Sequence, residues 1–116
     1  MKQIDRSTYS VAAGEVVTVE VIATLVGEFV SLVFDGAPQV PSGTGPITYN
    51  FTVTAPAGAT HFGVVTCSFP KAAPDDAHFQ IRLSATGAAG PSGPFEGSDV
   101  YKTDAIWTRP IQLMRL

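Results

Sequence analysis

Apolar and polar residues alternate over Ile47–Phe69, and this alternation constrains the fold more than any other feature of the chain. The segment ITYNFTVT has an apolar residue at every second position, with threonine or asparagine between them. After the turn APAGAT, the segment HFGVVTCSF alternates again. A period of two residues is typical of a strand with one buried face. The stretch therefore predicts two β-strands that form either a hairpin or a corner between two sheets.

Further strands are predicted on both sides of this stretch. Val16–Leu25 alternates with β-branched residues throughout, Phe29–Phe34 is apolar on both faces, and Phe79–Ala85 alternates with polar residues. Because β-branched and aromatic residues favour strands, these segments are predicted to be strands and not helices. Two segments rich in glycine and proline, Asp35–Pro46 and Gly87–Gly97, are predicted to be loops.

Weaker strand signals lie near the two ends of the chain. Lys2–Ala12 alternates weakly and predicts an edge strand. Near the other end, Pro110 divides an otherwise strand-like segment. Proline in a sheet belongs at an edge or a bulge, so we expect two strands, near Val100–Thr108 and near Ile111–Leu116.

The pattern as a whole predicts an all-β fold. No stretch has the periodicity of an amphipathic helix, and a chain of 116 residues is large enough for one domain with its own core. We expect a single-domain antiparallel β-sandwich over residues 1–116, immunoglobulin-like or fibronectin-like in size, with about seven or eight strands. A jelly roll or a small barrel is the alternative.

Charge and hydropathy exclude two classes of partner. The net charge is −3 and the seven Lys and Arg are scattered, so no basic stripe is present to bind a nucleic-acid backbone. The first residues, MKQIDR, lack the apolar core of a signal peptide, and no apolar run approaches the roughly 18 residues of a membrane span. We expect a soluble chain without nucleic-acid or membrane binding, and the sequence leaves its cellular compartment open.

Charged residues make up only 15% of the chain, against about 25% in an average soluble protein. Either a surface rich in Thr and Ser needs few charges, or part of the surface is covered by a partner. The C-terminal segment PIQLMRL is apolar on both faces and favours the second explanation. We therefore expect a homo-oligomer or a complex with a protein partner.

Motifs for nucleophilic catalysis are absent from the sequence. Cys67 is the single cysteine, and His61 shares its predicted strand face. The two residues are separated by about 20 Å of extended chain, whereas a nucleophile needs a base within hydrogen-bond reach. His78 on another strand is the remaining base, but a lone cysteine is more often a small core residue. We expect that the protein is not an enzyme.

Carboxylates at predicted loop positions are the candidate metal ligands: Asp75 with Asp76, and Glu96 with Asp99. Calcium takes six to eight oxygen ligands and is often held by loops. Neither pair has the spacing of a dedicated calcium loop, and aspartate is also common in turns because it caps them. We therefore expect no cofactor, with calcium at these four residues as the alternative.

Trp107, Tyr101 and Arg109 are the candidate ligand-binding residues, because they alternate on one side of the same late segment. Trp, Tyr and Arg are enriched at protein interfaces, and aromatic rings also stack on sugars. The competing explanation for Trp107 is that it is a large core residue.

The sequence therefore predicts a non-catalytic β-sandwich module for assembly or protein–protein interaction, as a structural subunit or an accessory domain. The alternative is a carbohydrate-binding, lectin-like module that uses Trp107, Tyr101 and Arg109, with calcium held by the loop carboxylates.

Overall fold

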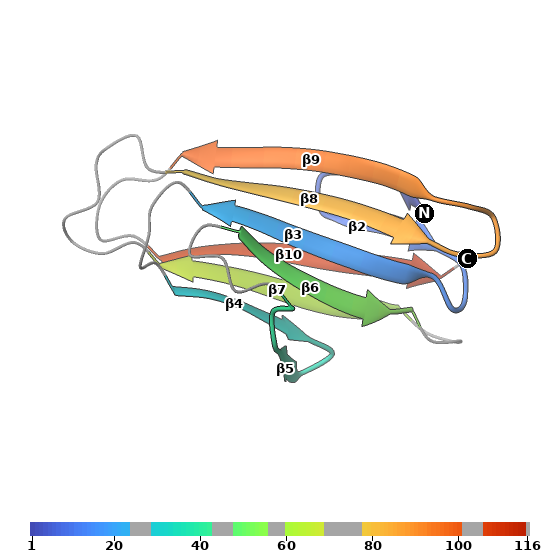
Figure 1. The fold of residues 1–116 in the computed structure, drawn as a ribbon, viewed down its shortest axis with the longest axis horizontal. Helices are drawn as coiled ribbons and strands as arrows, with labels where there is room; N and C mark the ends of the chain where they lie inside the picture. The colour runs from blue at the N-terminus through green and yellow to red at the C-terminus, as the bar shows by residue number, and fades with distance from the viewer. Residues whose placement is uncertain (24–28, 43–47, 56–59, 69–77, 101–105, 116) are drawn as a thin grey trace.

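Two β-sheets lie face to face in this computed structural model (Figure 1). The structure describes residues 1–23, 29–42, 48–55, 60–68, 78–100 and 106–115, and every regular element within these ranges is a strand. Sheet A has the order β1-β2-β10-β7-β4-β5, and sheet B has the order β6-β3-β8-β9. The all-β sandwich predicted from the alternation is thus confirmed. The strands are β1 (Lys2–Gln3), β2 (Thr8–Val11), β3 (Val16–Ala23), β4 (Phe29–Phe34), β5 (Ala37–Gln39), β6 (Thr48–Thr54), β7 (His61–Ser68), β8 (His78–Thr86), β9 (Ser92–Val100) and β10 (Ile106–Arg115).

The two strands predicted within Ile47–Phe69 lie in different sheets, as in the predicted corner, and do not form a hairpin. Its first strand, β6, pairs with β3 in sheet B, whereas its second strand, β7, lies between β4 and β10 in sheet A. Neighbouring strands are antiparallel in both sheets, apart from β2 and β10, which run parallel. The sandwich is therefore joined by a segment that contributes one strand to each layer.

The core consists of every second residue of the facing strands. In β6, Phe51 and Val53 are buried while Thr52 and Thr54 are exposed, as the alternation predicts. The same division holds in the two central strands of sheet B. Burying a large apolar side chain stabilises the fold by about 1.5–3 kcal/mol, so this layer is the main source of stability. Its largest buried members are Tyr9, Val17, Val19, Val21, Leu32, Phe51, Val65, Cys67, Phe79, Ile81, Leu83 and Leu113.

Part of the predicted loop Asp35–Pro46 is a strand, which corrects the sequence interpretation. Asp35 and Gly36 form a two-residue turn between β4 and β5, with φ angles of +50° and +78°. Positive φ at both positions is the conformation of the tight hairpin turns that Asp-Gly pairs favour. The N–H of Asp35 also donates to the carbonyl oxygen of Phe62 at 2.8 Å, which fixes the turn against β7.

The predicted loop Gly87–Gly97 is wrong from Ser92 onward, because β9 pairs with β8 along this segment. Glycine and proline are tolerated here since β9 is an edge strand and its pairing is irregular between Leu83 and Ala85. Phe95 packs against the core, with its ring centroid 5.8 Å from that of Tyr9. This segment has the composition of a loop but forms an edge strand, of which Phe95 packs against the core.

Pro110 does not divide the C-terminal segment into two strands, because β10 continues through it opposite Val64. The N–H of Gln112, two residues later, donates to Ser7 on the side of β2. Since alternate residues of a strand direct their backbone groups to the same side, Pro110 also faces that side. Pairing with β2 begins only at Gln112, so the missing N–H of Pro110 interrupts no ladder.

Gly93 and Gly90 offer a test of the β8–β9 hairpin, because both have φ near +90° (+90° and +93°). A Cβ on Gly93 would lie 2.6 Å from the carbonyl oxygen of Leu83, whereas a Cβ on Gly90 would meet nothing within 4 Å. We expect Gly90→Ala to cost about 1–2 kcal/mol from the backbone conformation. Gly93→Ala should lower the free energy of unfolding by about 1–3 kcal/mol more than Gly90→Ala does, because its Cβ would clash with the carbonyl oxygen of Leu83. Urea denaturation of both variants measures the difference, and equal losses would contradict the close strand approach.

Candidate functional site

The centre of the outer face of sheet A differs in charge from the outer face of sheet B. In the centre of sheet A, Val64 of β7 lies opposite Val33 of β4 and Pro110 of β10. The outward positions of β4, β7 and β10 whose side chains are described carry no Asp, Glu, Lys, Arg or His, and we call them the uncharged face. They are Ser31, Val33, Phe62, Val64, Thr66, Ser68, Ile106, Thr108, Pro110, Gln112 and Met114.

Large apolar side chains are exposed on the uncharged face. Val33 is 38% exposed, Phe62 is 52% exposed and Ile106 is 76% exposed. Charged residues are depleted and large apolar residues are enriched in the centre of protein interfaces. The chemistry of this face is therefore that of a surface which another protein can cover.

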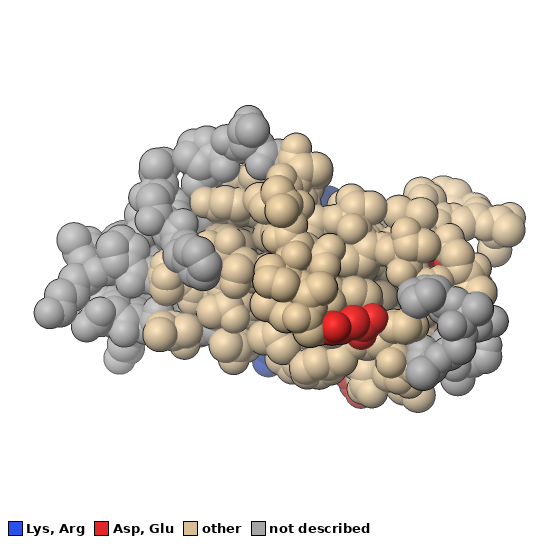
Figure 2. All heavy atoms as spheres, turned by 90° about the horizontal axis from the view of Figure 1, so that it is seen from below, with Lys and Arg blue, Asp and Glu red and all other residues tan. Residues whose placement is uncertain are grey.

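Charge is sparse on another side of the molecule as well. Figure 2 shows the molecule from below, which is the side of β4, β5 and β6 in Figure 1. The described surface on this side is mostly uncharged, with one acidic group near the centre. Little blue is visible on this side. The low charge of the sequence thus leaves wide parts of the described surface without ionised groups.

The outer face of sheet B, by contrast, carries a row of three charged side chains. Glu20 of β3, Arg82 of β8 and Glu96 of β9 are cross-strand neighbours. Nη1 of Arg82 donates to Oε1 of Glu20 at 3.3 Å, and Nε of Arg82 lies 2.8 Å from Oε1 of Glu96. All three side chains are partly exposed, so each ion pair contributes about 0–1 kcal/mol.

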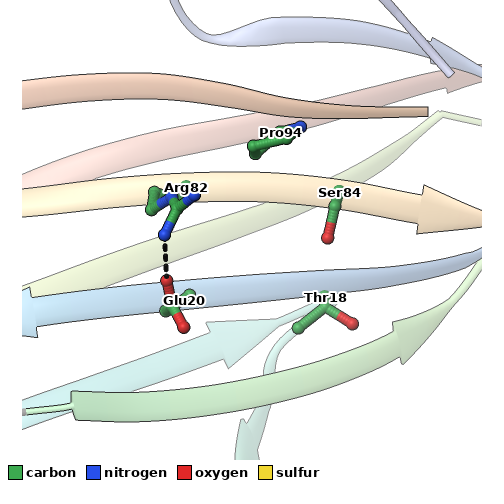
Figure 3. A pocket seen from close by; sticks show the side chains of 5 residues that line it. All are labelled: Thr18, Glu20, Arg82, Ser84 and Pro94. Atoms are coloured by element: carbon green, nitrogen blue, oxygen red, sulfur yellow. Dashed lines mark hydrogen bonds and ion pairs between the residues drawn. The ribbon is translucent and has the colours of Figure 1, made fainter.

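A shallow hollow of about 290 Å³ lies beside this row (Figure 3). Thr18 and Ser84 are cross-strand partners on one side of it, and Glu20 and Arg82 are partners on the other. Pro94 of β9 completes the lining. Two hydroxyl groups beside a guanidinium and a carboxylate offer both donors and acceptors to a polar ligand. The carboxylates of Glu20 and Glu96 together outweigh the single positive charge of Arg82, so the hollow does not favour an anion.

The side chains of Asp35 and His61 are in contact at the turn between β4 and β5. Oδ2 of Asp35 lies 2.6 Å from Nδ1 of His61, and Oδ1 accepts a hydrogen bond from the N–H of Phe62 at 3.0 Å. The ring of His61 stacks on Phe34, with 6.1 Å between the centroids. Nε2 of His61 is buried and has no hydrogen-bond partner among the described residues. An Asp–His pair orients a base in hydrolases, but Nε2 here is buried among the described residues.

The surroundings of Asp35 set its ionisation. Burial raises the pKa of the Asp35 carboxyl, but the hydrogen bond from Phe62 and the hydrogen bond and charge of His61 outweigh burial. The net effect is a pKa below the ordinary value of 3.8. The ionised carboxylate therefore belongs to the folded state and helps to hold the turn against β7.

Arg109 is buried, with 6% of its surface exposed, between the two sheets. Its Nη2 donates to the carbonyl oxygen of Arg6 at 3.1 Å. A Cβ on Gly97 of β9 would lie only 2.5 Å from Nη1, so the guanidinium packs against the backbone of β9 where no side chain intervenes. Burial raises the pKa of the neighbouring Tyr9, and the charge of Arg109 opposes this rise in part. Arg109 thus links β10 to the edge of sheet B.

The structure does not bring the predicted ligand-binding residues together on an exposed surface that it describes. Arg109 is enclosed, Trp107 lies in β10 opposite Cys67, and Tyr101 lies outside the described residues. A ligand-binding role for Trp107 and Tyr101 stays a prediction. Cys67 itself is fully buried.

Of the four predicted calcium ligands, the structure describes the backbone positions of Glu96 and Asp99, both in β9. Glu96 pairs with Arg82, and Asp99 lies in β9 opposite Phe79. Asp75 and Asp76 lie outside the described residues. Within the described ranges, no group of three or more His, Cys, Asp or Glu side chains is arranged to hold a metal ion.

Sequence reasoning missed two groupings, and one of them had a visible signal. The turn at Asp35 brings that residue to His61, and an Asp-Gly pair between apolar runs is a strong indication of a hairpin. The pairing of Glu20 with Arg82 had no such signal, because it depends on the register between β3 and β8.

Comparison with known proteins gives no relative for this chain. No protein-family model matches the sequence, and neither the curated proteins nor the solved structures contain a match. The part of the chain that the structure describes contains no helix with the length and hydropathy of a membrane span.

Asp35 predicts a specific loss of stability in acid. Because the pKa of Asp35 is lowered by folding, its contribution is complete above pH 3.8 and is lost as the pH falls through the folded-state pKa. Asp35→Asn removes this titration, and asparagine still tolerates the positive φ of the turn. We expect Asp35→Asn to lower the free energy of unfolding by no more than about 1 kcal/mol at pH 7, because the carboxylate is partly exposed. Urea denaturation between pH 2 and pH 7 should show a shallower acid dependence for the variant than for the wild type. Identical acid dependence in the two proteins would contradict the role of the carboxylate.

Proposed function

We propose that this chain is a non-catalytic β-sandwich module for assembly or protein–protein interaction. The observation that carries the proposal is the uncharged face of sheet A with its exposed Val33, Phe62 and Ile106. Such a surface is unfavourable in water and favourable against another protein, because no ion has to be desolvated when it is covered.

The contrast between the centres of the two sheets supports this proposal. The outer face of sheet B carries Glu20, Arg82 and Glu96 in one row, so the fold accommodates charges on an exposed sheet. The described outward positions of β4, β7 and β10 carry no such charges, and neither do those of β6 at the edge of sheet B. We propose a homo-oligomer or a complex with a protein partner, formed by an immunoglobulin-like module.

A carbohydrate-binding module is the second candidate, and the hollow beside Arg82 favours it. Thr18, Ser84, Glu20 and Arg82 present alternating donors and acceptors, which neighbouring hydroxyl groups of a sugar can match. We propose sheet B as the location of this sugar site, and the proposal does not depend on Trp107, Tyr101 or Arg109.

A Lys in the centre of the uncharged face tests the assembly proposal. Thr108 is exposed on β10, opposite Thr66 of β7. We expect the wild-type chain to associate with itself, and Thr108→Lys to raise the dissociation constant about tenfold or more, because a covered ammonium is costly to desolvate. Light scattering over a dilution series measures the change. Thr86→Lys, at an exposed strand position of sheet B, is the matched control and should leave association unchanged. Equal association of the wild type and Thr108→Lys would contradict the use of this face.

The carbohydrate-binding candidate predicts signals on a glycan array. Arg82→Gln should abolish them, because the amide replaces the donor fork of the guanidinium. An array that stays blank for the wild type, with and without calcium, would remove this candidate.

A further inference from the structure

Three of the four edge strands in the described part of the chain carry features that discourage pairing with another chain. In sheet A, β1 has only two residues and includes Lys2, and β5 has three residues with Pro38 at its centre. In sheet B, β9 contains Pro94 and Glu96 and pairs irregularly with β8. Short length, proline, charge and irregular pairing are the ways in which sheet proteins protect their edges.

The fourth edge, β6, has none of these features. Its sequence, TYNFTVT, contains no charge and no proline, and it pairs with β3 in regular register from Thr48 to Thr54. Threonine, tyrosine, phenylalanine and valine also favour extended backbone. β6 is thus a regular, uncharged edge strand, and Figure 2 shows few charges on the side of the molecule where it lies.

The backbone groups on the outer side of β6 can be assigned from two hydrogen bonds. Ala55 donates its N–H to Glu15 on the side of β3, and Asn50 accepts a bond from the N–H of Ser42 on the opposite, outer side. Alternate residues share a side, so the N–H and C=O groups of Thr52 and Thr54 also point outward. No described residue bonds to these groups.

We infer that the outer edge of β6 pairs with the same edge of a second copy of this chain, antiparallel and around a two-fold axis at Val53. In this register Thr52 lies opposite Thr54 of the second copy, and the outward donors and acceptors of both residues are all satisfied. The inference rests on the proposed assembly function and adds a second copy of the chain as the partner and the β6 edge as a second surface, separate from the uncharged face.

The second copy fits this edge better than another strand for two reasons. The open part of β6 is short, since Ser42 already occupies the carbonyl of Asn50, and an identical edge offers an open part of the same length. Both strands are uncharged, so no like charges lie directly opposite each other in the paired strands. Thr–Thr pairs across antiparallel strands are also favourable.

Substitutions at Thr52 distinguish the contribution of its backbone N–H to association from that of its side chain. Thr52→Pro removes an outward N–H and leaves the ladder with β3, because proline is tolerated at the free side of an edge strand. Thr52→Val keeps the N–H and nearly the same shape, and is the matched control. Thr52→Lys adds the charge by which natural edges are protected, and serves if the proline variant fails to fold. Far-UV circular dichroism checks the fold of each variant.

Analytical ultracentrifugation of the purified chain, from about 10 µM to about 1 mM, covers the weak association that a small interface predicts. We expect association between copies in the wild type and in Thr52→Val. The dissociation constant should be at least about tenfold higher in Thr52→Pro, which loses a backbone hydrogen bond at the edge, and in Thr52→Lys, which places two like charges there.

The outcomes distinguish this inference from the proposed function. If Thr108→Lys weakens association and folded Thr52→Pro and Thr52→Lys do not, the β6 edge is excluded and assembly through the uncharged face stands. If the wild type remains a single chain up to about 1 mM, pairing between copies is overturned. The proposed function then depends on capture of a different protein that Thr108→Lys abolishes and Thr86→Lys does not.

Discussion

The shared layer of inward side chains between the two sheets is the constraint on which the rest of the structure depends. Val19 in the middle of β3 lies opposite Phe51 of β6 on one side and Leu83 of β8 on the other, and all three are buried. A slip of one residue in either pairing would turn Glu20 into the core, at the cost of an unpaired buried charge. The register of sheet B is therefore fixed from inside. Because the inner layer determines the fold, the outer faces are free to differ, and they do.

Alternation was sufficient to predict the strands with one buried and one exposed face, such as β6 and β8. It failed where a strand is an edge, because β9 has one inward anchor, Phe95, among glycines and a proline that a central strand would not tolerate. Pro110 was misleading for a related reason, since its effect depends on which neighbour its nitrogen faces. The surroundings of Arg109 could not be predicted either, because they require Gly97 from another sheet to lie against its guanidinium. Contacts between residues distant in sequence depend on register and layer order, which local patterns do not contain.

The uncharged face belongs to sheet A, whereas the β6 edge and the hollow beside Arg82 both belong to sheet B, where Thr52 is the cross-strand partner of Thr18. Two of these surfaces are proposed to meet copies of themselves. A molecule with one self-complementary surface forms a closed dimer, whereas a molecule with two independent ones continues into a chain of alternating contacts. The mass of the assembly at high concentration would therefore report how many of the surfaces act at once.

The position of β10 has a consequence for the order in which the molecule can form. β10 comes after all the other described strands in the sequence, yet it lies inside sheet A, between β2 at residues 8–11 and β7 at residues 61–68. The four strands of sheet B are complete by residue 100, so that sheet can form as soon as they have left the ribosome. Sheet A has to wait, with the edges of β2 and β7 unpaired, until β10 is inserted between them. Pairing between such distant segments is slow, and during this interval the nascent chain is most exposed to aggregation.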